Sequence, residues 1–466
     1  MSEKQGQLVR SIGLGAATAL VISSVIGSGV FKKVAPMSAE LQSPTLVLLC
    51  WVLAGLVSLA GTLSNAEIGS MLADSGGEFA YFRTIYNRFF AYLFGWSQFA
   101  VVRTASIASL AYVFSQSFNS LVPLGNPLAA WADVDLLGLH PFDNSGVKIL
   151  GITLIVGLTY FNYRGLKLGA SLSNVLTVAM LIIIALIVVL GLTMSDGSMS
   201  NITTNSVTYD PDKLSGMTLF KAMFVASLSA FWGYEGWAAL GYIGGEIKNP
   251  QRNLPLALTL GSLIIMAVYL LLNFTYLYVM PIDNFIAIHQ SQNGIAAVSV
   301  VKHFLGEGGG WIISVLILIT TFNCTSSTLL TSARISYSMA KDGVFFKGTE
   351  YVHPDYNTPS KALWIQAFWS AVMMLSGTFD QLTDMLIFAS FIFYGATTVG
   401  VFILRKRMPD AERPYKVVGY PIVPLIFIVA CVALLINTLF SRPYEALIGL
   451  ALIATGLPFY WYWTKK

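Results

Sequence analysis

Long apolar segments recur along the whole chain, and short polar connections separate them. A helix needs about 20 mostly apolar residues to cross a bilayer, and the pattern predicts twelve such segments. Because the number is even, we expect both termini on the same side of the membrane. The predicted segments are 11–37, 44–72, 84–118, 146–162, 170–194, 217–244, 256–279, 310–340, 361–378, 381–405, 420–440 and 444–463.

The first segment is interrupted by Gly27-Ser28-Gly29. Two glycines in three residues weaken a helix and permit backbone conformations that are closed to other residues. In lipid an unpaired amide is costly, so a break survives only where protein or a water-filled cavity receives it. The free N–H groups suit a carboxylate and the free carbonyls suit an amine, which together describe a small zwitterion. The alternative is close helix packing, which small residues also permit.

A second interruption lies in the sixth segment, where Gly233 and Gly236 flank Glu235. The first and sixth segments each open a group of five. Interrupted helices at corresponding positions of two halves point to an inverted repeat with a binding site between them. We therefore expect an all-α polytopic membrane protein with one transmembrane domain. This domain is expected to span residues 1–466.

Composition supports the membrane class, and charge gives an orientation. The chain is 55% hydrophobic and 11% charged, with a mean hydropathy of +0.69, whereas soluble domains carry about 25% charged residues. Lys and Arg concentrate in one alternating set of connections, which we assign to the cytoplasm. We therefore expect a multi-pass cell-membrane protein with both termini cytoplasmic. The net charge of +4 indicates no nucleic-acid partner, because the basic residues lie in short connections between apolar segments.

No pattern in the sequence indicates a cofactor, a metal or a catalysed reaction. Cys50, Cys324 and Cys431 lie in apolar segments without metal-ligand spacing, so we expect buried, inert thiols. The four histidines are scattered in predicted loops and form no ligand cluster. The phosphate-binding pattern G-x-x-x-x-G-K-[ST] does not occur, so we expect neither ATP use nor an enzyme.

Several short motifs occur in a fixed order along the chain. They are Ile26-Gly27-Ser28-Gly29-Val30-Phe31, Ser75-Gly-Gly-Glu78, Val102-Arg103, Glu246-Ile-Lys-Asn-Pro-Gln-Arg-Asn-Leu-Pro255, Arg334 with Asp342-Gly343, and Arg413-Pro414. By these motifs the chain resembles the amino acid–polyamine–organocation superfamily over residues 11–463, and within it the L-type amino-acid transporters and their bacterial relatives. The resemblance implies twelve helices in a five-plus-five inverted repeat with discontinuous helices one and six. The repeats would span 11–194 and 217–405, and two extra helices would span 420–463. It also implies alternating-access transport of an amino acid.

The resemblance further implies a substrate site at the two interruptions. The amides of Gly27, Ser28 and Gly29 would hold the α-carboxylate. Trp232 falls where the family keeps an aromatic gate, and an ordinary core aromatic is the alternative. The α-amine would bind carbonyls near Val25, Ile26, Trp232 and Glu235, and the full substrate-binding stretch also includes Phe231 and Gly233.

Several further positions bear on gating and coupling. Met180 stands where many L-type relatives carry a lysine, and a methionine offers neither a proton nor a cation. Glu235 could gate or couple transport, recognise a cationic side chain, or pair with a basic group or backbone amides. Arg103 could likewise pair structurally or act as a gate. Asn323 and Ser327 in the eighth segment suggest a wet face or an ion site, with interhelical hydrogen bonding as the alternative.

We therefore expect a secondary transporter of L-amino acids, working by exchange or facilitated diffusion of neutral substrates. The alternatives are a cationic amino-acid or amine antiporter, motivated by Met180 and Glu235, an ion-coupled symporter, and a membrane enzyme or channel. The expected partners are a small-molecule L-amino acid and the lipid bilayer. Some L-type relatives pair with a glycoprotein through an extracellular cysteine. All three cysteines here lie in predicted spans, so no disulfide-linked partner is expected.

Overall fold

The computed structural model describes residues 12–72, 77–135, 140–164, 170–238, 240–241, 247–291, 293–356 and 358–465. Within these ranges the chain is helical, and the single strand-type contact is a parallel bridge between Ile12 and Ile247. Parts of two predicted motifs, namely Ser75, Gly76 and Glu246, lie outside the described residues.

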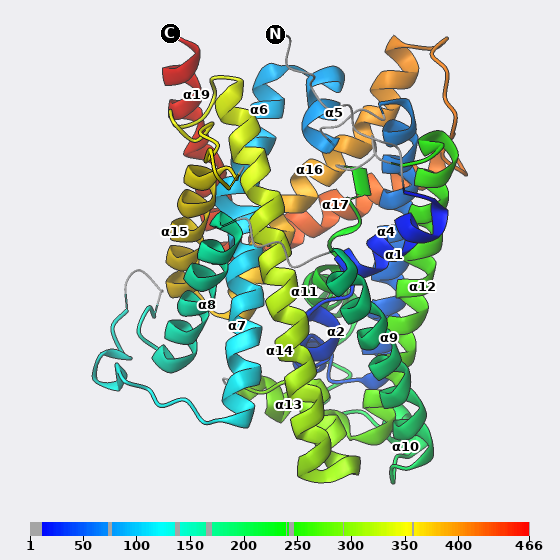
Figure 1. Ribbon diagram of the computed structural model, residues 1–466. Helices are drawn as coiled ribbons and strands as arrows, with labels where there is room; N and C mark the ends of the chain where they lie inside the picture. Colours follow the sequence, from blue (N-terminus) through cyan, green and yellow to red (C-terminus); the bar gives the residue numbers. More distant parts are fainter. Residues whose placement is uncertain are drawn as a thin grey trace.

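The helices pack side by side as an elongated bundle (Figure 1). The first half contains α1 (Leu14–Val25), α2 (Gly29–Lys32), α3 (Val34–Leu41), α4 (Pro44–Met71), α5 (Gly77–Ile85), α6 (Arg88–Ser97), α7 (Arg103–Leu121), α8 (Ser145–Tyr163) and α9 (Ala170–Thr193). The second half contains α10 (Met199–Thr203), α11 (Gly216–Tyr234), α12 (Pro250–Val279), α13 (Ile282–Gln290), α14 (Ala296–Lys341), α15 (Ser360–Ser376), α16 (Phe379–Arg407), α17 (Ile422–Ser441), α18 (Pro443–Ala454) and α19 (Gly456–Thr464).

Seven helices in the described ranges are long and apolar enough to cross a membrane. This agrees with the prediction of an all-α polytopic membrane protein. The first predicted segment contributes no such helix because its break leaves α1 with only 12 residues. In α14 the backbone of Gly306 is non-helical, with φ 68° and ψ −165°, which separates a short leading helix from the long one. Twelve crossings and the inverted repeat remain predictions.

The two ends of the bundle carry different elements (Figure 1). At one end lie α5, α6 and α19, and at the other lie α10 and α13. We refer to them as the α19 end and the α13 end. The long helix α14 runs from the α13 end to the α19 end.

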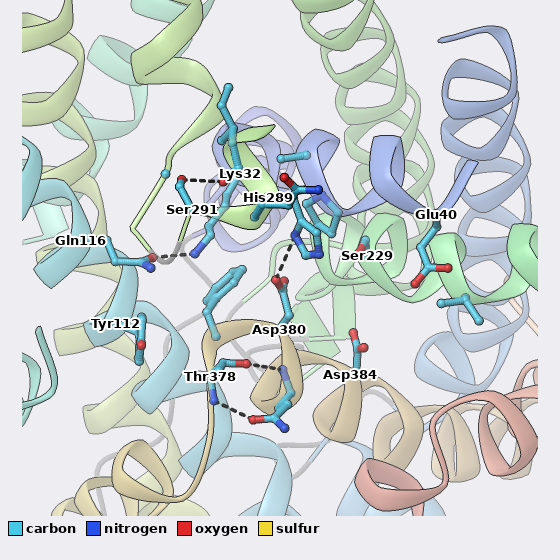
Figure 2. Close-up of a pocket in the computed structure, with 18 of the residues that line it drawn as sticks. Lys32, Glu40, Tyr112, Gln116, Ser229, His289, Ser291, Thr378, Asp380 and Asp384 are labelled. Atoms are coloured by element: carbon cyan, nitrogen blue, oxygen red, sulfur yellow. Dashed lines mark hydrogen bonds and ion pairs between the residues drawn. The ribbon is translucent and has the colours of Figure 1, made fainter. Parts of the chain in front are cut away.

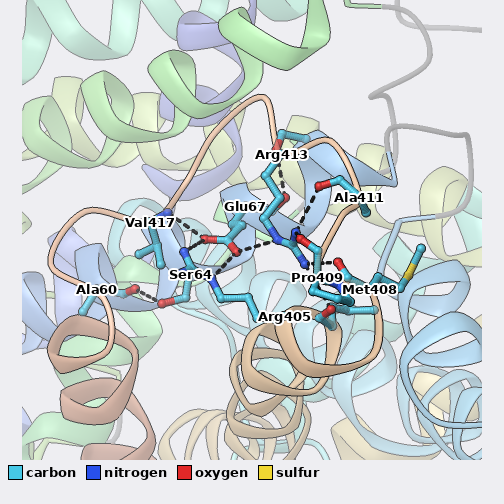
Figure 3. Close-up of polar contacts among 11 residues, drawn as sticks. Ala60, Ser64, Glu67, Arg405, Met408, Pro409, Ala411, Arg413 and Val417 are labelled. Carbon is cyan, nitrogen blue, oxygen red and sulfur yellow. Dashed lines mark hydrogen bonds and ion pairs between the residues drawn. The ribbon is translucent and has the colours of Figure 1, made fainter.

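A buried carboxylate ties α4 to the end of α16 and the loop that follows it (Figure 3). Glu67 is 1% exposed and accepts hydrogen bonds from Arg405 at 2.8 and 2.7 Å and from the Val417 amide at 2.7 Å. Arg413 lies 3.7 Å from Glu67 and donates to carbonyls of the same loop. Because a buried charge needs partners, this cluster fixes the loop before α17. The Arg413-Pro414 motif therefore has a structural role.

Candidate functional site

The first interruption leaves a group of backbone donors without backbone partners. Helix α1 ends at Val25, and Ile26 is extended with ψ 100°. The next helix, α2, begins at Gly29. Among the described residues, the amides of Gly27, Ser28 and Gly29 donate to no backbone carbonyl. The hydroxyl of Ser28 is also buried without a partner, so the break concentrates unsatisfied polar groups in one place.

The second interruption touches the first. Helix α11 ends at Tyr234, Glu235 is extended with ψ 143°, and Gly236 has φ +121°. A Cβ on Gly236 would lie 2.3 Å from the carbonyl oxygen of Ser24. Both the positive φ and this close approach therefore require glycine at position 236. The Ser24 hydroxyl donates to the Gly236 carbonyl at 3.3 Å, so the two breaks are in direct contact.

The two glycines of the first break serve different purposes. A Cβ on Gly29 would lie 2.8 Å from the Cα of Gly233 and 3.1 Å from Cδ1 of Trp232. The packing interpretation therefore applies to Gly29. A Cβ on Gly27 would meet only the Val25 carbonyl oxygen, at 3.9 Å. The space beside Gly27 is open, so this glycine is free of any packing requirement.

A tyrosine that the sequence analysis missed joins both breaks. The hydroxyl of Tyr269, on α12, lies 3.1 Å from the Val25 carbonyl oxygen and 2.8 Å from that of Gly233. The Trp51 ring packs edge-on against Tyr269 and Tyr234, with centroids 5.4 and 5.7 Å apart. The available signal was a tyrosine inside an apolar span, because a buried hydroxyl needs a polar partner. The Val25 carbonyl, expected to bind an amine, already accepts one hydrogen bond.

A cavity of about 330 Å³ opens beside the two breaks. It brings together eight of the predicted site residues: Val25, Gly27, Ser28, Gly29, Trp232, Glu235, Asn323 and Ser327. We refer to this space as the central cavity. Its lining continues along α14 to Thr331, and α14 runs toward the α19 end from there (Figure 1). The central cavity therefore extends toward the α19 end.

Four predicted residues lie elsewhere. Ile26, Phe231, Gly233 and Met180 are buried away from the lining of the central cavity. Phe231 packs its ring against Phe391, with centroids 4.5 Å apart. Gly233 lies under the Trp51 ring, which a Cβ would approach to 2.8 Å. These positions pack the helices around the break and do not face the cavity.

One wall of the central cavity carries opposite charges. Arg103 and Glu235 both line it, and Glu235 accepts hydrogen bonds from the Tyr394 hydroxyl at 2.7 and 3.0 Å. The Arg103 Nε donates to Gln98 at 3.1 Å. A π-helical turn, Gln98–Val102, directly precedes Arg103, and such turns are frequent at functional sites. Glu235 therefore has a polar partner on α16, which the sequence did not reveal.

The polar run in α14 divides between two faces. The Ser326 hydroxyl and carbonyl contact Asn162 of α8 at 3.3 Å, an interhelical contact. Asn323, Cys324 and Ser327 face the central cavity. Interhelical hydrogen bonding therefore applies to Ser326, whereas the wet-face interpretation applies to Asn323 and Ser327. Cys324 corrects the expectation of three inert thiols, because it lines the cavity and is partly exposed, whereas the other two cysteines are buried.

A layer of aromatic and charged side chains closes the central cavity toward the α13 end. Trp232 packs edge-on against Phe379, with centroids 6.1 Å apart. Lys33 is fully buried and forms an ion pair with Asp380 at 2.6 Å. Lys32 donates to Gln116 of α7 at 2.6 Å, and both lysine ammonium groups lie over the Phe379 ring. The layer therefore joins the end of the first break to α7 and α16. We call it the closed layer, and its members are Lys32, Lys33, Trp232, Phe379 and Asp380.

Comparison with known proteins identifies the family of the chain. The chain is 32% identical over 468 residues to the serine/threonine exchanger SteT of Bacillus subtilis. The aligned region covers 100% of this chain and 99% of that protein. It is 28% identical to the b(0,+)-type amino acid transporter 1 of Mus musculus, over 98% of this chain and 88% of the other. The large neutral amino acids transporter small subunit 2 of Mus musculus is 26% identical, over 98% and 82%. The family described as amino acid permease matches residues 12–459, and the chain therefore belongs to the amino acid permease family.

Proposed function

We propose that this permease exchanges neutral L-amino acids across the cell membrane by alternating access. The observation that carries the proposal is the set of three backbone amides, at Gly27, Ser28 and Gly29, which lack backbone partners beside a cavity. Backbone N–H groups that bind a carboxylate form charge-assisted hydrogen bonds. Every amino acid carries this carboxylate, so such a site admits a range of side chains.

The remaining parts of the substrate would face different walls. The α-amine would bind carbonyls of the two breaks that face the cavity, among them that of Glu235. The side chain would extend toward Arg103, Asn323 and Ser327. Trp232 would act as a lid, because it lines the central cavity and also packs into the closed layer.

A neutral substrate fits the charges of the cavity wall. The Glu235 carboxylate is occupied by Tyr394, and the Arg103 charge also acts on it. A cationic side chain would therefore have to compete with Arg103 for the same carboxylate. The cationic antiporter remains the second candidate because Glu235 does line the cavity. The names of the relatives, an exchanger among them, support exchange over uptake driven by an ion gradient.

The proposed orientation places the α19 end in the cytoplasm and the α13 end outside. Arg405, Lys406 and Arg407 end α16, and positive charge favours the cytoplasmic side. The central cavity then faces inward while the closed layer seals the outside. The two five-helix repeats would move against each other to reverse this arrangement.

Counterflow in proteoliposomes tests the proposal. Vesicles loaded with unlabelled L-threonine should take up labelled L-threonine or L-leucine, and empty vesicles should not. Sodium and pH gradients should have no effect, because Met180 offers no ionisable group at the coupling position. Uptake that requires either gradient would establish a symporter, and uptake of L-arginine alone would establish the cationic antiporter. Unsaturable flux would establish a channel.

A further inference from the structure

A second cavity lies on the other side of the closed layer, and the function proposed above does not use it. It measures about 380 Å³ and lies between α3, α7, α11, α13 and α16 (Figure 2). Its polar lining includes Lys32, Tyr112, Ser229, His289, Asp380 and Asp384. We refer to it as the vestibule. One side of the vestibule is lined by residues of α13 and of the turn after it.

Asp384 is a carboxylate without a partner in the vestibule wall. It is 9% exposed, and within the described ranges it makes no hydrogen bond and no ion pair. Figure 2 shows its carboxylate pointing away from α16, toward the side of the cavity where Ser229 lies. Buried carboxylates are normally paired. An unpaired carboxylate that faces a cavity indicates a binding group for a cation.

Most of the other carboxylates of the vestibule are paired within the described residues; Glu445, which also lines it, has no ion pair there but is only partly buried. Asp380 binds Lys33 at 2.6 Å. Glu40 pairs with Arg442, and Asp143 pairs with Lys148. Among the unpaired carboxylates of the lining, Asp384 is therefore distinguished by its burial, with 9% of its surface exposed.

The charges close to Asp384 favour a positively charged ligand. They belong to Lys33, Asp380, Arg442 and Glu445. Lys33 and Asp380 neutralise each other, and Arg442 is neutralised by Glu40, so the charge left beside Asp384 is that of the Glu445 carboxylate. Ser229 adds a hydroxyl that faces the same space.

Lys32 supplies the opposite charge on another wall of the vestibule. Its ammonium group donates to Gln116 and lies over the Phe379 ring. An ammonium group has three donors, so Lys32 keeps donors for a ligand carboxylate. The vestibule thus presents an acceptor for an ammonium group and a donor for a carboxylate, and its volume falls in the range of about 300–1,000 Å³ that is typical of ligand pockets.

We propose that the vestibule is a second amino-acid binding site, in which Asp384 accepts the ligand's ammonium group and Lys32 donates to its carboxylate. The choice of ligand depends on the proposed function, because it assumes that the permease meets free amino acids at this end. The closed layer separates the two sites, so each can hold its own molecule. An amino acid bound here would lie beside the Lys33–Asp380 pair, because Asp380 precedes Asp384 by one helical turn of α16.

Equilibrium binding of labelled L-threonine to the purified protein in detergent counts the sites. We expect two high-affinity sites per protein for the wild type, one for Asp384→Asn, one for Gly27→Val, and no high-affinity site for the double variant. Each lost site should show a fall in affinity of about tenfold or more, as expected for a charge-assisted hydrogen bond. Glu307→Gln is the matched control, because Glu307 lies outside the vestibule lining, pairs with Lys302 and is exposed.

The separate variants distinguish the two proposals. If Gly27→Val keeps both molecules while Asp384→Asn loses one, the central site is wrong and the vestibule site stands. If Asp384→Asn binds L-threonine with the stoichiometry and affinity of the wild type, the vestibule proposal is overturned.

A chemical probe covers the case in which Asp384→Asn does not fold. Ser229→Cys, combined with Cys324→Ser, places one reactive thiol in the vestibule. A cationic methanethiosulfonate reagent should modify it about tenfold faster than an anionic one, because the local charge attracts cations. L-threonine should slow this reaction even when Gly27→Val is also present. Faster reaction with the anionic reagent, or no protection by L-threonine, would overturn the proposal.

Discussion

The central cavity and the vestibule lie on opposite sides of one closed layer, yet they are built from different groups. The central cavity offers backbone amides at the break between α1 and α2, whereas the vestibule offers charged side chains, Lys32 and Asp384. Backbone donors are held by the fold and need no ordering before they bind. Side-chain ion pairs such as Lys33–Asp380 can separate and form again. The comparison suggests that the fixed site recognises what all amino acids share, and that the charged layer controls access.

The largest effect is expected at Gly236, where the two breaks of the central cavity touch. Gly236→Ala should abolish transport and lower the melting temperature strongly, because the added Cβ would lie 2.3 Å from the Ser24 carbonyl oxygen at a φ of +121°. Gly216→Ala is the control. Gly216 also has a positive φ, +50°, but open space around its Cβ, so it should lose only about 1–2 kcal/mol of stability. Equal losses in the two variants would show that backbone strain, and not contact between the breaks, decides the effect.

The next effect concerns the closed layer. Lys33→Met removes the cation from a pair whose lysine is fully buried and whose aspartate is 32% exposed. Removing one partner of a buried pair costs about 3–5 kcal/mol, and the exposure of Asp380 puts this case near the lower limit. The layer should open more often, so that Cys324 in the central cavity reacts at least about tenfold faster with a thiol reagent added outside.

The control for Lys33→Met is Lys302→Met. Lys302 also pairs with a carboxylate at 2.6 Å, but both side chains are exposed, and such pairs contribute about 0–1 kcal/mol. The reactivity of Cys324 should not change in this control. If Lys33→Met also leaves the reactivity of Cys324 unchanged, the closed layer is not the barrier between the two cavities.

The smallest effect is expected at Tyr269. Tyr269→Phe removes a hydroxyl that contacts the Val25 and Gly233 carbonyls, at a cost of about 1 kcal/mol. Exchange should slow a few-fold, because the two breaks lose their common partner. Tyr276→Phe on the same helix is a close control, since Tyr276 is equally buried but its hydroxyl has no partner. The proposed role of Tyr269 fails if thermal unfolding and exchange respond alike to both substitutions.

The sequence predicted the two breaks because their cause is local. Glycines inside an apolar segment weaken a helix wherever the segment lies, and lipid makes the resulting free amides costly. This reasoning identified Gly27, Ser28 and Glu235 as site residues, and they do line one cavity. It did not separate Gly27 from Gly29, because the difference depends on how closely α11 approaches.

The missed features depend on contacts between distant parts of the chain. Lys33 and Asp380 are 347 residues apart in sequence, and Glu235 and Tyr394 are 159 residues apart. No periodicity or motif links such pairs. The vestibule was missed for the same reason, since Lys32 and Asp384 come from opposite halves of the chain. Phe231 was assigned to the site by its neighbours in sequence, but on a helix adjacent residues face different directions.

The affinity of the Gly27→Val variant for labelled L-threonine at the central cavity tests the central claim most directly, with Asp384→Asn present to remove the vestibule site. Gly27 has open space around its Cβ, so the valine side chain should occupy the place of the carboxylate without disturbing helix packing. Gly157→Val on α8 is the matched control, because Gly157 also has no neighbour within 4 Å. We predict that Gly27→Val stays monodisperse and binds at least about tenfold more weakly, while Gly157→Val binds as the parent does. A stable Gly27→Val protein with unchanged affinity would contradict the assignment of the substrate site to these backbone amides.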